Sequence, residues 1–285
     1  MKGVLEGELG NLAAHIRKKV KSVMRRKSIL GLFLVLMMAF SLMPASVFGT
    51  DDNLKTYYGK PQAFGDGAVV TYVTVDRSRV PVALGIEIPA KSLGSLPASA
   101  QELIFEFPNE ASSTPFRFMD LGWNPQGHPP VGTYTVPHLD VHFYLQTLQE
   151  RNSIDPGPCE GLDCADYKRA VRDVPAQYVP QDYRNVGAVA PRMGNHLIDP
   201  ASGEFNHQPF TRTFLYGAYD GKITFYEPML SLHYLQSQPN EYLDLKLPAA
   251  YAQAGYYPTR YSVRYDAAKG VYRIALERFV YHAAQ

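Results

Sequence analysis

Short runs of β-branched and aromatic residues recur from residue 67 to residue 282, and they constrain the fold more than any other feature of the sequence. Such side chains fit the half-buried surface of a pleated sheet. Turn-forming residues separate the runs, as expected between successive antiparallel strands. The predicted strands cover residues 67–77, 80–89, 102–108, 133–145, 214–219, 222–232 and 259–282.

Two tight-turn signals support antiparallel pairing, namely Asp220-Gly221 and the segment Asp266–Gly270 inside the last run. Helical patterns are few, and long segments rich in Pro, Tyr and Gly are interpreted as loops. We therefore expect an all-β, mostly antiparallel domain, either barrel-like or a sandwich, with a few short helices and long loops. The expected helices cover residues 145–154 and 165–171, and the expected long loops cover residues 155–185 and 237–258.

The N-terminal segment has the pattern of a secretory signal peptide. A basic stretch at residues 24–27 precedes an apolar run within residues 28–49, and the likeliest cleavage point follows Gly49. The alternative is a permanent anchor, because spanning a bilayer takes about 20 apolar residues. Pro44 interrupts the run and favours cleavage, so we expect export to the periplasm or the exterior without a permanent membrane anchor.

The chain therefore divides into an N-terminal extension with a signal peptide, residues 1–49, and a single β-rich domain, residues 50–285. Whether Met1 or Met24 is the initiator stays open at this stage. Residues 1–49 hold eight Lys and Arg but two Asp and Glu, so the chain's net charge of +1 becomes −5 for residues 50–285. A mildly acidic surface argues against a nucleic-acid partner, because that affinity comes largely from neutralising phosphates.

Export also affects the interpretation of the two cysteines. Cys159 and Cys164 are close enough in sequence to close a local loop, and disulfides persist in oxidising compartments. The alternative is a pair of metal ligands, but a zinc site of this kind normally has a second pair. We therefore predict a disulfide.

The most informative stretch for chemistry runs from Val136 to Tyr144. Side chains two residues apart share a face of a strand, so His138, Asp140 and His142 point together while the apolar residues between them point to the other face. If these polar groups are buried, they must be paired with each other or bound to a metal. Residues four apart lie about 13 Å apart along a straight strand, too far to share one ion without a bend, whereas neighbours two apart lie about 7 Å apart and can converge.

Two other segments offer partners for this strand. His196 follows a Gly-Asn pair, and Glu227 stands in an aromatic strand just before a proline. The structural alternative is a hydrogen-bonded polar face without metal, in which Glu227 pairs with an arginine such as Arg192 or Arg212. His128, in a Gly-His-Pro-Pro segment, is interpreted as a loop residue. Sequence signatures of lipases, zinc proteases, P-loops and dinucleotide-binding folds are absent from the chain.

Three segments together resemble a known family: GHPPVGTYTVPHLDVHFYL (127–145), PRMGNHLIDP (191–200) and TFLYGAYDGKITFYEPML (213–230). The chain is similar over about residues 55–235 to a family of exported bacterial β-rich domains of unassigned activity, typified by an envelope-stress sigma-factor-regulated protein of a thermophile. The resemblance implies a barrel-like fold and export. It also implies that the polar residues matching the family pattern are His138, Asp140, His142, His196 and Glu227.

Two functions follow as hypotheses. In the first, the protein is exported and binds a divalent metal (Zn, Mn, Fe or Cu), and whether it is also an enzyme stays open. The ligands are His138, His142, His196 and Glu227, and Asp140 orients a ligand. In the second, the same residues form only a hydrogen-bond network in a non-catalytic envelope protein that binds a ligand or associates with itself. Unpaired edge strands are compatible with a homo-oligomer, and no pattern identifies a small-molecule ligand.

Overall fold

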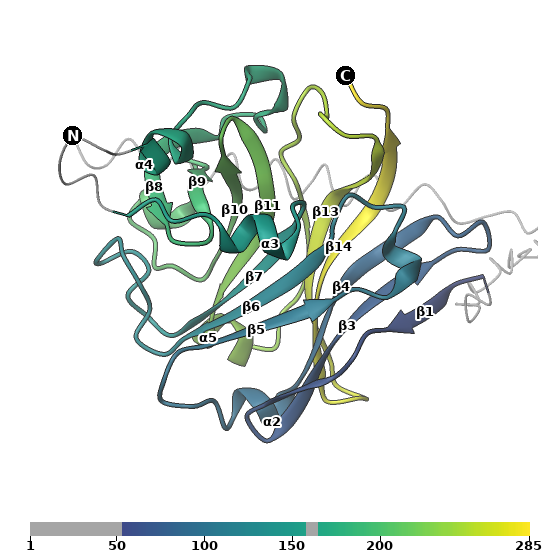
Figure 1. Ribbon diagram of the computed structural model, residues 1–285. Helices are drawn as coiled ribbons and strands as arrows, with labels where there is room; N and C mark the ends of the chain where they lie inside the picture. Colours follow the sequence, from purple (N-terminus) through teal and green to yellow (C-terminus); the bar gives the residue numbers. More distant parts are fainter. Residues whose placement is uncertain (1–52, 158–164) are drawn as a thin grey trace, which may run out of the picture. The chain divides into compact units, whose positions relative to one another are not determined.

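The computed structural model describes residues 53–157 and 165–285 (Figure 1). Within these residues the chain is mostly antiparallel β, which confirms the predicted fold class. The strands form two sheets, and the outermost strand at each edge of a sheet has a neighbour on one side only. Neither sheet closes on itself, so the fold is a sandwich and the barrel alternative was wrong.

The first sheet has seven strands among the described residues, in the order β1-β3-β4-β14-β13-β12, with β2 also paired to β3. All of its neighbouring strands run antiparallel. Its strands are β1 (Lys55–Tyr58), β2 (Gln62–Phe64), β3 (Gly67–Val75), β4 (Pro81–Pro89), β12 (Asn240–Asp244), β13 (Gly255–Asp266) and β14 (Val271–His282).

The second sheet also has seven strands among the described residues, in the order β5-β6-β7-β11-β10-β9-β8, again antiparallel. The strand β7 therefore lies in its interior, between β6 and β11. Its strands are β5 (Gln101–Glu106), β6 (Phe118–Asn124), β7 (His138–Tyr144), β8 (Arg184–Ala190), β9 (Gly194–Ile198), β10 (Arg212–Tyr219) and β11 (Lys222–Ser231).

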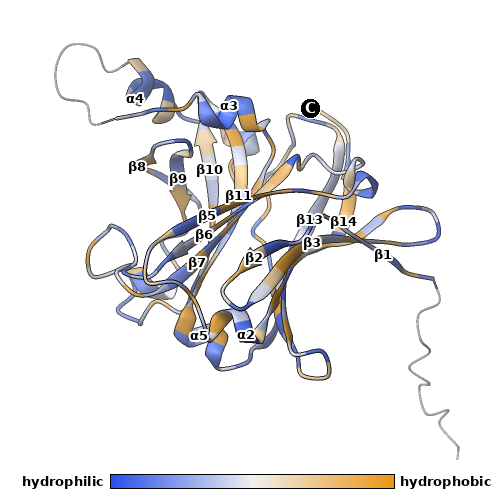
Figure 2. Ribbon diagram, turned by 60° about the horizontal axis from the view of Figure 1, so that its bottom comes forward, coloured by the Kyte–Doolittle hydropathy of each residue, from blue (hydrophilic) through white to orange (hydrophobic). Residues whose placement is uncertain are grey.

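Apolar side chains from both sheets form one continuous core. The first sheet contributes residues such as Leu84 and Ile274, and the second contributes Leu121, Val141 and Tyr226. Figure 2 shows hydrophobic and hydrophilic residues mixed along the strands of both sheets, as expected when alternate side chains of each strand face opposite ways. Burial of this shared core is the main force that holds the two sheets together.

The helices are short. Two of them agree with the expected helices, namely α3 (Leu148–Asn152) and α4 (Ala165–Ala170). Among the described residues, no helix has the length and apolar character needed to cross a bilayer. The remaining helical segments are α2 (Ala90–Leu93), α5 (Leu232–Gln236) and the 3₁₀ turns η1 (Asn109–Ala111), η2 (Ala176–Tyr178) and η3 (Gly203–Phe205).

Several boundaries differ from the prediction. The expected loop at residues 237–258 was wrong, because it contains β12 and the beginning of β13. Strands β1, β2, β6, β8 and β9 were also missed. Residues 133–137, expected to begin a strand, precede β7 instead. The predicted signal peptide and the predicted Cys159–Cys164 disulfide lie outside the described residues and stay predictions.

A glycine in the second sheet creates space on its outer face. Gly217 in β10 is paired with Phe225 on one side and with His196 on the other. A Cβ atom at Gly217 would lie 2.1 Å from two ring atoms of Phe225. The absence of a side chain therefore lets the Phe225 ring lie across β10, beside His196.

We expect the Gly217→Ala variant to unfold more readily, because the added methyl group overlaps the Phe225 ring. Overpacking of this kind costs about 1–3 kcal/mol of unfolding free energy. Urea denaturation measures the loss. The matched control is Gly157→Ala, since a Cβ there meets no described atom within 4 Å; equal stabilities for the two variants would contradict the packing argument.

Candidate metal centre

The strand β7 is buried on both faces. All seven of its residues are buried, although one face is apolar and the other is ionisable. Leu139, Val141 and Phe143 pack into the core between the sheets. His138 and His142 point to the opposite face of the sheet, as the alternation predicted.

Loops and neighbouring aromatic residues cover this second face. Tyr134 and Phe210, which lie in loops, pack with Leu215 and Met229 in a separate buried cluster. The Phe210 ring also lies edge-on to His138, with ring centroids 5.6 Å apart. The polar face is thus enclosed by protein, where an unpaired polar group costs roughly 2–7 kcal/mol.

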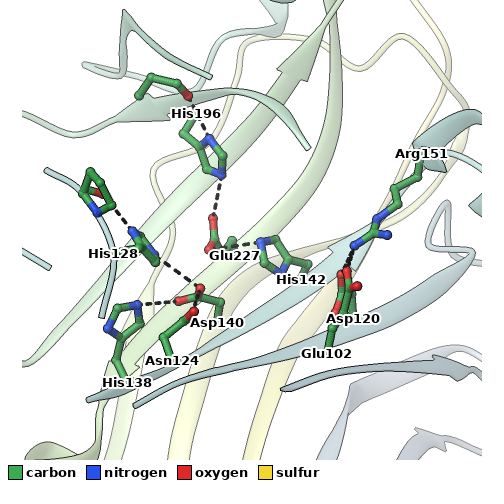
Figure 3. A network of polar contacts seen from close by, with 12 residues as sticks. Glu102, Asp120, Asn124, His128, His138, Asp140, His142, Arg151, His196 and Glu227 are labelled. Atoms are coloured by element: carbon green, nitrogen blue, oxygen red, sulfur yellow. Dashed lines mark hydrogen bonds and ion pairs between the residues drawn. The ribbon is translucent and has the colours of Figure 1, made fainter. Parts of the chain in front are cut away.

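The register of the strands brings the polar residues together. Asp120 in β6 is paired with His142, and Asp140 is paired with Met229 in β11. Glu227 stands two residues before Met229 and therefore lies beside His142. Figure 3 shows two carboxylates, each placed between two imidazoles.

The first of these sets, here called the His142 group, consists of His142, His196 and Glu227. Each residue offers one ligand atom, and these atoms all lie within 4.8 Å of one another. His142 Nε2 lies 3.1 Å from Glu227 Oε1, and His196 Nε2 lies 3.8 Å from Glu227 Oε2. His196 lies on β9 and Glu227 on β11, so this contact spans the intervening strand β10.

The second set, here called the His138 group, consists of His128, His138 and Asp140, and it meets the same criterion. His138 Nε2 lies 3.2 Å from Asp140 Oδ1, and His128 Nε2 lies 3.4 Å from Asp140 Oδ2. Asn124 Nδ2 donates a hydrogen bond to Asp140 Oδ2 at 2.7 Å and fixes the orientation of the carboxylate.

The predicted ligands therefore do not form one set. The structure brings His142, His196 and Glu227 together, and it places His138 with Asp140 instead. This division follows from the strand spacing, because His138 and His142 are four residues apart on β7. Asp140, predicted to orient a ligand, supplies a carboxylate to the His138 group.

The positions of His128 and Asp120 at the site were not predicted from the sequence. His128 comes from the loop between β6 and β7, and the path of this loop brings its ring to Asp140. Asp120 is paired with His142 on the adjacent strand. The alternation of apolar and polar residues in residues 118–124 could have placed Asp120 on the outer face, but it could not have named the partner.

Two histidines are held by the backbone in a way that defines their free nitrogen. His138 Nδ1 lies 2.7 Å from the Val136 carbonyl oxygen, and His196 Nδ1 lies 2.9 Å from the Ala188 carbonyl oxygen. A carbonyl only accepts, so Nδ1 carries the hydrogen in both rings. In a neutral ring, Nε2 then carries a lone pair and can only accept, and in both of these rings it faces a carboxylate oxygen. Two acceptors face each other only when a proton or a metal cation lies between them.

The carboxylates change the pKa values of their neighbours. Burial disfavours the charged imidazole of His142, but Glu227, together with the charges of Asp120 and Asp140, more than offsets this effect and raises the pKa of His142 to about 9. Burial likewise opposes protonation of His128, but the hydrogen bond and charge of Asp140 raise its pKa to about 9. Burial lowers the pKa of His196, so that ring is neutral at pH 7.

The arginines expected to pair with Glu227 have other partners. Arg192 Nη1 lies 2.8 Å from Glu102 Oε2, and Arg212 Nε lies 2.8 Å from Glu241 Oε2. In the part of the chain that the structure describes, Glu227 forms ion pairs with histidines and with no arginine or lysine. The same holds for Asp140.

A buried arginine pairs with the cross-strand neighbour of His142. Arg151 is 1% exposed, and its Nη2 lies 2.5 Å from Asp120 Oδ2 and also contacts Glu102. Arg151 is held there by α3, whose first turn is closed by reciprocal hydrogen bonds between Thr147 and Glu150. Asp120 is therefore neutralised by a cation of the protein, unlike Glu227 and Asp140.

Comparisons of the chain with protein-family models, with curated proteins and with solved structures return no match. The family resemblance therefore stays a prediction.

We expect the Arg151→Met variant to lose about 3–5 kcal/mol of unfolding free energy, because Asp120 then keeps a buried charge without its cation. Urea denaturation measures the loss. Replacing Asp120 by Asn in the same chain should recover part of it, and the double-mutant cycle gives the coupling. Arg169→Met is the matched control, since Arg169 pairs with Asp220 at the surface; an equal loss there would contradict the argument.

A second prediction concerns pH in metal-free protein. His142 and His128 have raised pKa values, so the stability they contribute is full below pH 6.5 and is lost as the pH rises to about 9. The melting temperature in a chelator should therefore fall over this interval. Glu227→Gln should weaken the pH dependence, whereas the exposed His207→Asn should keep it. A wild-type melting temperature that does not change with pH over this interval would show that Glu227 and Asp140 do not stabilise the protonated forms of His142 and His128.

Proposed function

We propose that this chain is an exported protein that binds a divalent transition-metal ion through the His142 group. The carrying observation is that two imidazole nitrogens converge on one buried carboxylate that has no lysine or arginine partner among the described residues. The export part of the proposal is supported by the signal-peptide pattern in residues 24–49.

The donor atoms suit a transition metal. Imidazole nitrogen binds Zn²⁺, Fe²⁺ and Cu²⁺ well, and a carboxylate extends the range to Mn²⁺. Hard ions such as Ca²⁺ and Mg²⁺ prefer sites made of oxygen ligands alone. The set of two histidines and one glutamate therefore supports a borderline transition metal, without selecting one of the four.

Unsatisfied polar atoms in the group support an ion more than a hydrogen-bond network. Within the described residues, Glu227 Oε2 and both ring nitrogens of His142 are buried without a hydrogen-bond partner. His142 Nε2 and Glu227 Oε1 lie close enough for a hydrogen bond, but they are not aligned for one. Both could instead bond to one ion placed to the side of the line that joins them.

The group is also held in place before any ion arrives. The Ala188 carbonyl fixes the His196 ring, and the Phe225 ring packs against both histidines, with centroids 5.0 Å from His142 and 5.3 Å from His196. Ligands held in this way lose little conformational freedom on binding. This arrangement favours tight binding over a loose surface site.

The chemistry open to such a centre depends on its coordination number. Catalytic zinc sites use three protein ligands and keep a fourth position for water or substrate. An ion held by the His142 group would have that open position and would supply a water of lowered pKa. Asp120, held by Arg151, is the cross-strand neighbour of His142 and would lie beside such a centre.

The alternative function is a non-catalytic envelope protein in which the group is only an ion-paired network. The raised pKa of His142 is the observation in its favour, because an imidazolium beside Glu227 also balances the buried charge. The two functions differ in metal content, which can be measured directly.

We expect protein purified without a histidine tag, loaded in turn with Zn²⁺, Mn²⁺, Fe²⁺ and Cu²⁺ and desalted, to retain metal in stoichiometric amount. Glu227→Gln and His196→Asn should weaken binding by more than the 10–100-fold that loss of an outer partner typically costs. Elemental analysis and competition with a chelating dye measure content and affinity.

The matched control is His207→Asn. His207 is exposed and has a φ of 62°, a conformation that asparagine tolerates well. This variant should bind like the wild type. Protein that retains none of the four metals, or variants of Glu227 and His196 that bind as tightly as the control, would overturn the proposal in favour of the ion-paired network.

A further inference from the structure

We infer that the His138 group holds a second divalent transition-metal ion, so that the polar face of the second sheet carries a two-ion centre. This inference rests on the proposed function for the first ion. It adds a site made of His128, His138 and Asp140, of which His128 comes from a loop and the other two from β7.

The distances in the His138 group suit one shared ion. Atoms bonded to one ion at about 2.0–2.2 Å lie roughly 3–3.5 Å from one another. The Nε2 atoms of His138 and His128 lie 3.2 Å and 3.4 Å from the two oxygens of Asp140. The longer of these two distances, 3.4 Å, is below the longer distance in the His142 group, which is 3.8 Å.

Both histidines of the group present the same nitrogen. His138 Nδ1 is hydrogen-bonded to the Val136 carbonyl, and His128 Nδ1 lies 2.8 Å from the Pro129 carbonyl. Each Nδ1 therefore carries its hydrogen, and each Nε2 is turned to Asp140. Ligating histidines typically donate their other N–H to a carbonyl or carboxylate in this way.

Two buried atoms of the group lack a hydrogen-bond partner. These are His138 Nε2 and Asp140 Oδ1, in the portion of the chain that the structure describes. His138 is fully buried, and Asp140 is 4% exposed. The pair lies at contact distance without hydrogen-bond alignment, which is the arrangement expected of two ligands of one cation.

The second ion is distinct from the first because of the strand spacing. His138 and His142 lie about 13 Å apart along β7, too far to share an ion, whereas Asp140 and His142 lie about 7 Å apart. Glu227 stands on the neighbouring strand, two residues from the partner of Asp140. Such diagonal neighbours lie about 7–8 Å apart, so the two ions would be close enough for magnetic interaction.

Charge supports a pair of cations. Asp140 and Glu227 are buried and have histidines as their only ion-pair partners within the described ranges. Two divalent ions would exceed the charge of these two carboxylates by two. The ligand class that such a pair would attract is therefore an oxygen anion, such as a carboxylate or a phosphate.

The test is metal stoichiometry in the full chain, followed by electron paramagnetic resonance of the Mn²⁺-loaded and Cu²⁺-loaded forms. We expect two ions per wild-type chain and a spin-coupled spectrum. Asp140→Asn and Glu227→Gln should each abolish the coupling and lower the content to one ion or fewer. His128→Asn gives a milder variant, because its side chain is 37% exposed on a loop and is not part of the sheet; it should also remove the second ion.

The outcomes separate this inference from the proposed function. One ion per wild-type chain, lost in Glu227→Gln and kept in both Asp140→Asn and His128→Asn, would overturn the second ion and leave the first in place. One ion lost only in the variants of the His138 group would overturn the assignment of the first ion. Circular dichroism of the metal-free variants, with His207→Asn as control, tests whether a variant that loses an ion still has the wild-type secondary structure.

Discussion

The arrangement depends on one constraint, which is that β7 is covered on both faces while its sequence makes one of those faces ionisable. The apolar face needs no explanation beyond the core between the sheets. The other face places Asp140 beside His138 and Glu227 beside His142 in an enclosed environment, where charge must be balanced locally. Other features serve this requirement. The covering loops enclose the polar groups, Gly217 leaves room for the Phe225 ring beside His196, and Asn124 orients the Asp140 carboxylate.

The way charge is balanced divides the face into two kinds of site. Arg151 neutralises the charge of Asp120 with a group of the protein itself, so this carboxylate has a permanent cation as its partner. Asp140 and Glu227 have only histidines, whose charge depends on pH and whose neutral form is a good metal ligand. The polar face of the second sheet therefore combines a structural ion pair, between Asp120 of β6 and Arg151 of α3, with two groups that have the chemistry of a metal centre.

Local pattern predicted much of this fold and part of the site. The runs at residues 67–77, 80–89 and 222–232 correspond to β3, β4 and β11, because apolar, β-branched and aromatic residues recur along them. β9, with Gly194-Asn195, and β12, with Asn240 and Asp244, were missed because their sequences resemble turns and depend on pairing with a neighbour. The alternation in β7 correctly separated polar from apolar side chains. It could not tell which histidine meets which carboxylate, since that depends on the register with β11 and on a loop that brings His128 back to the sheet.

The uneven exposure of the ligands has a kinetic consequence. His128 and His196 have side chains that are 37% and 14% exposed, whereas those of Asp140 and Glu227 are 6% and 2% exposed. An ion that leaves would first detach from an outer histidine while the inner carboxylate still holds it. Exchange would then proceed through opening of the His128 loop or of the strand that carries His196, without disturbing the core. Release of a bound ion would then depend on local motion of these outer segments.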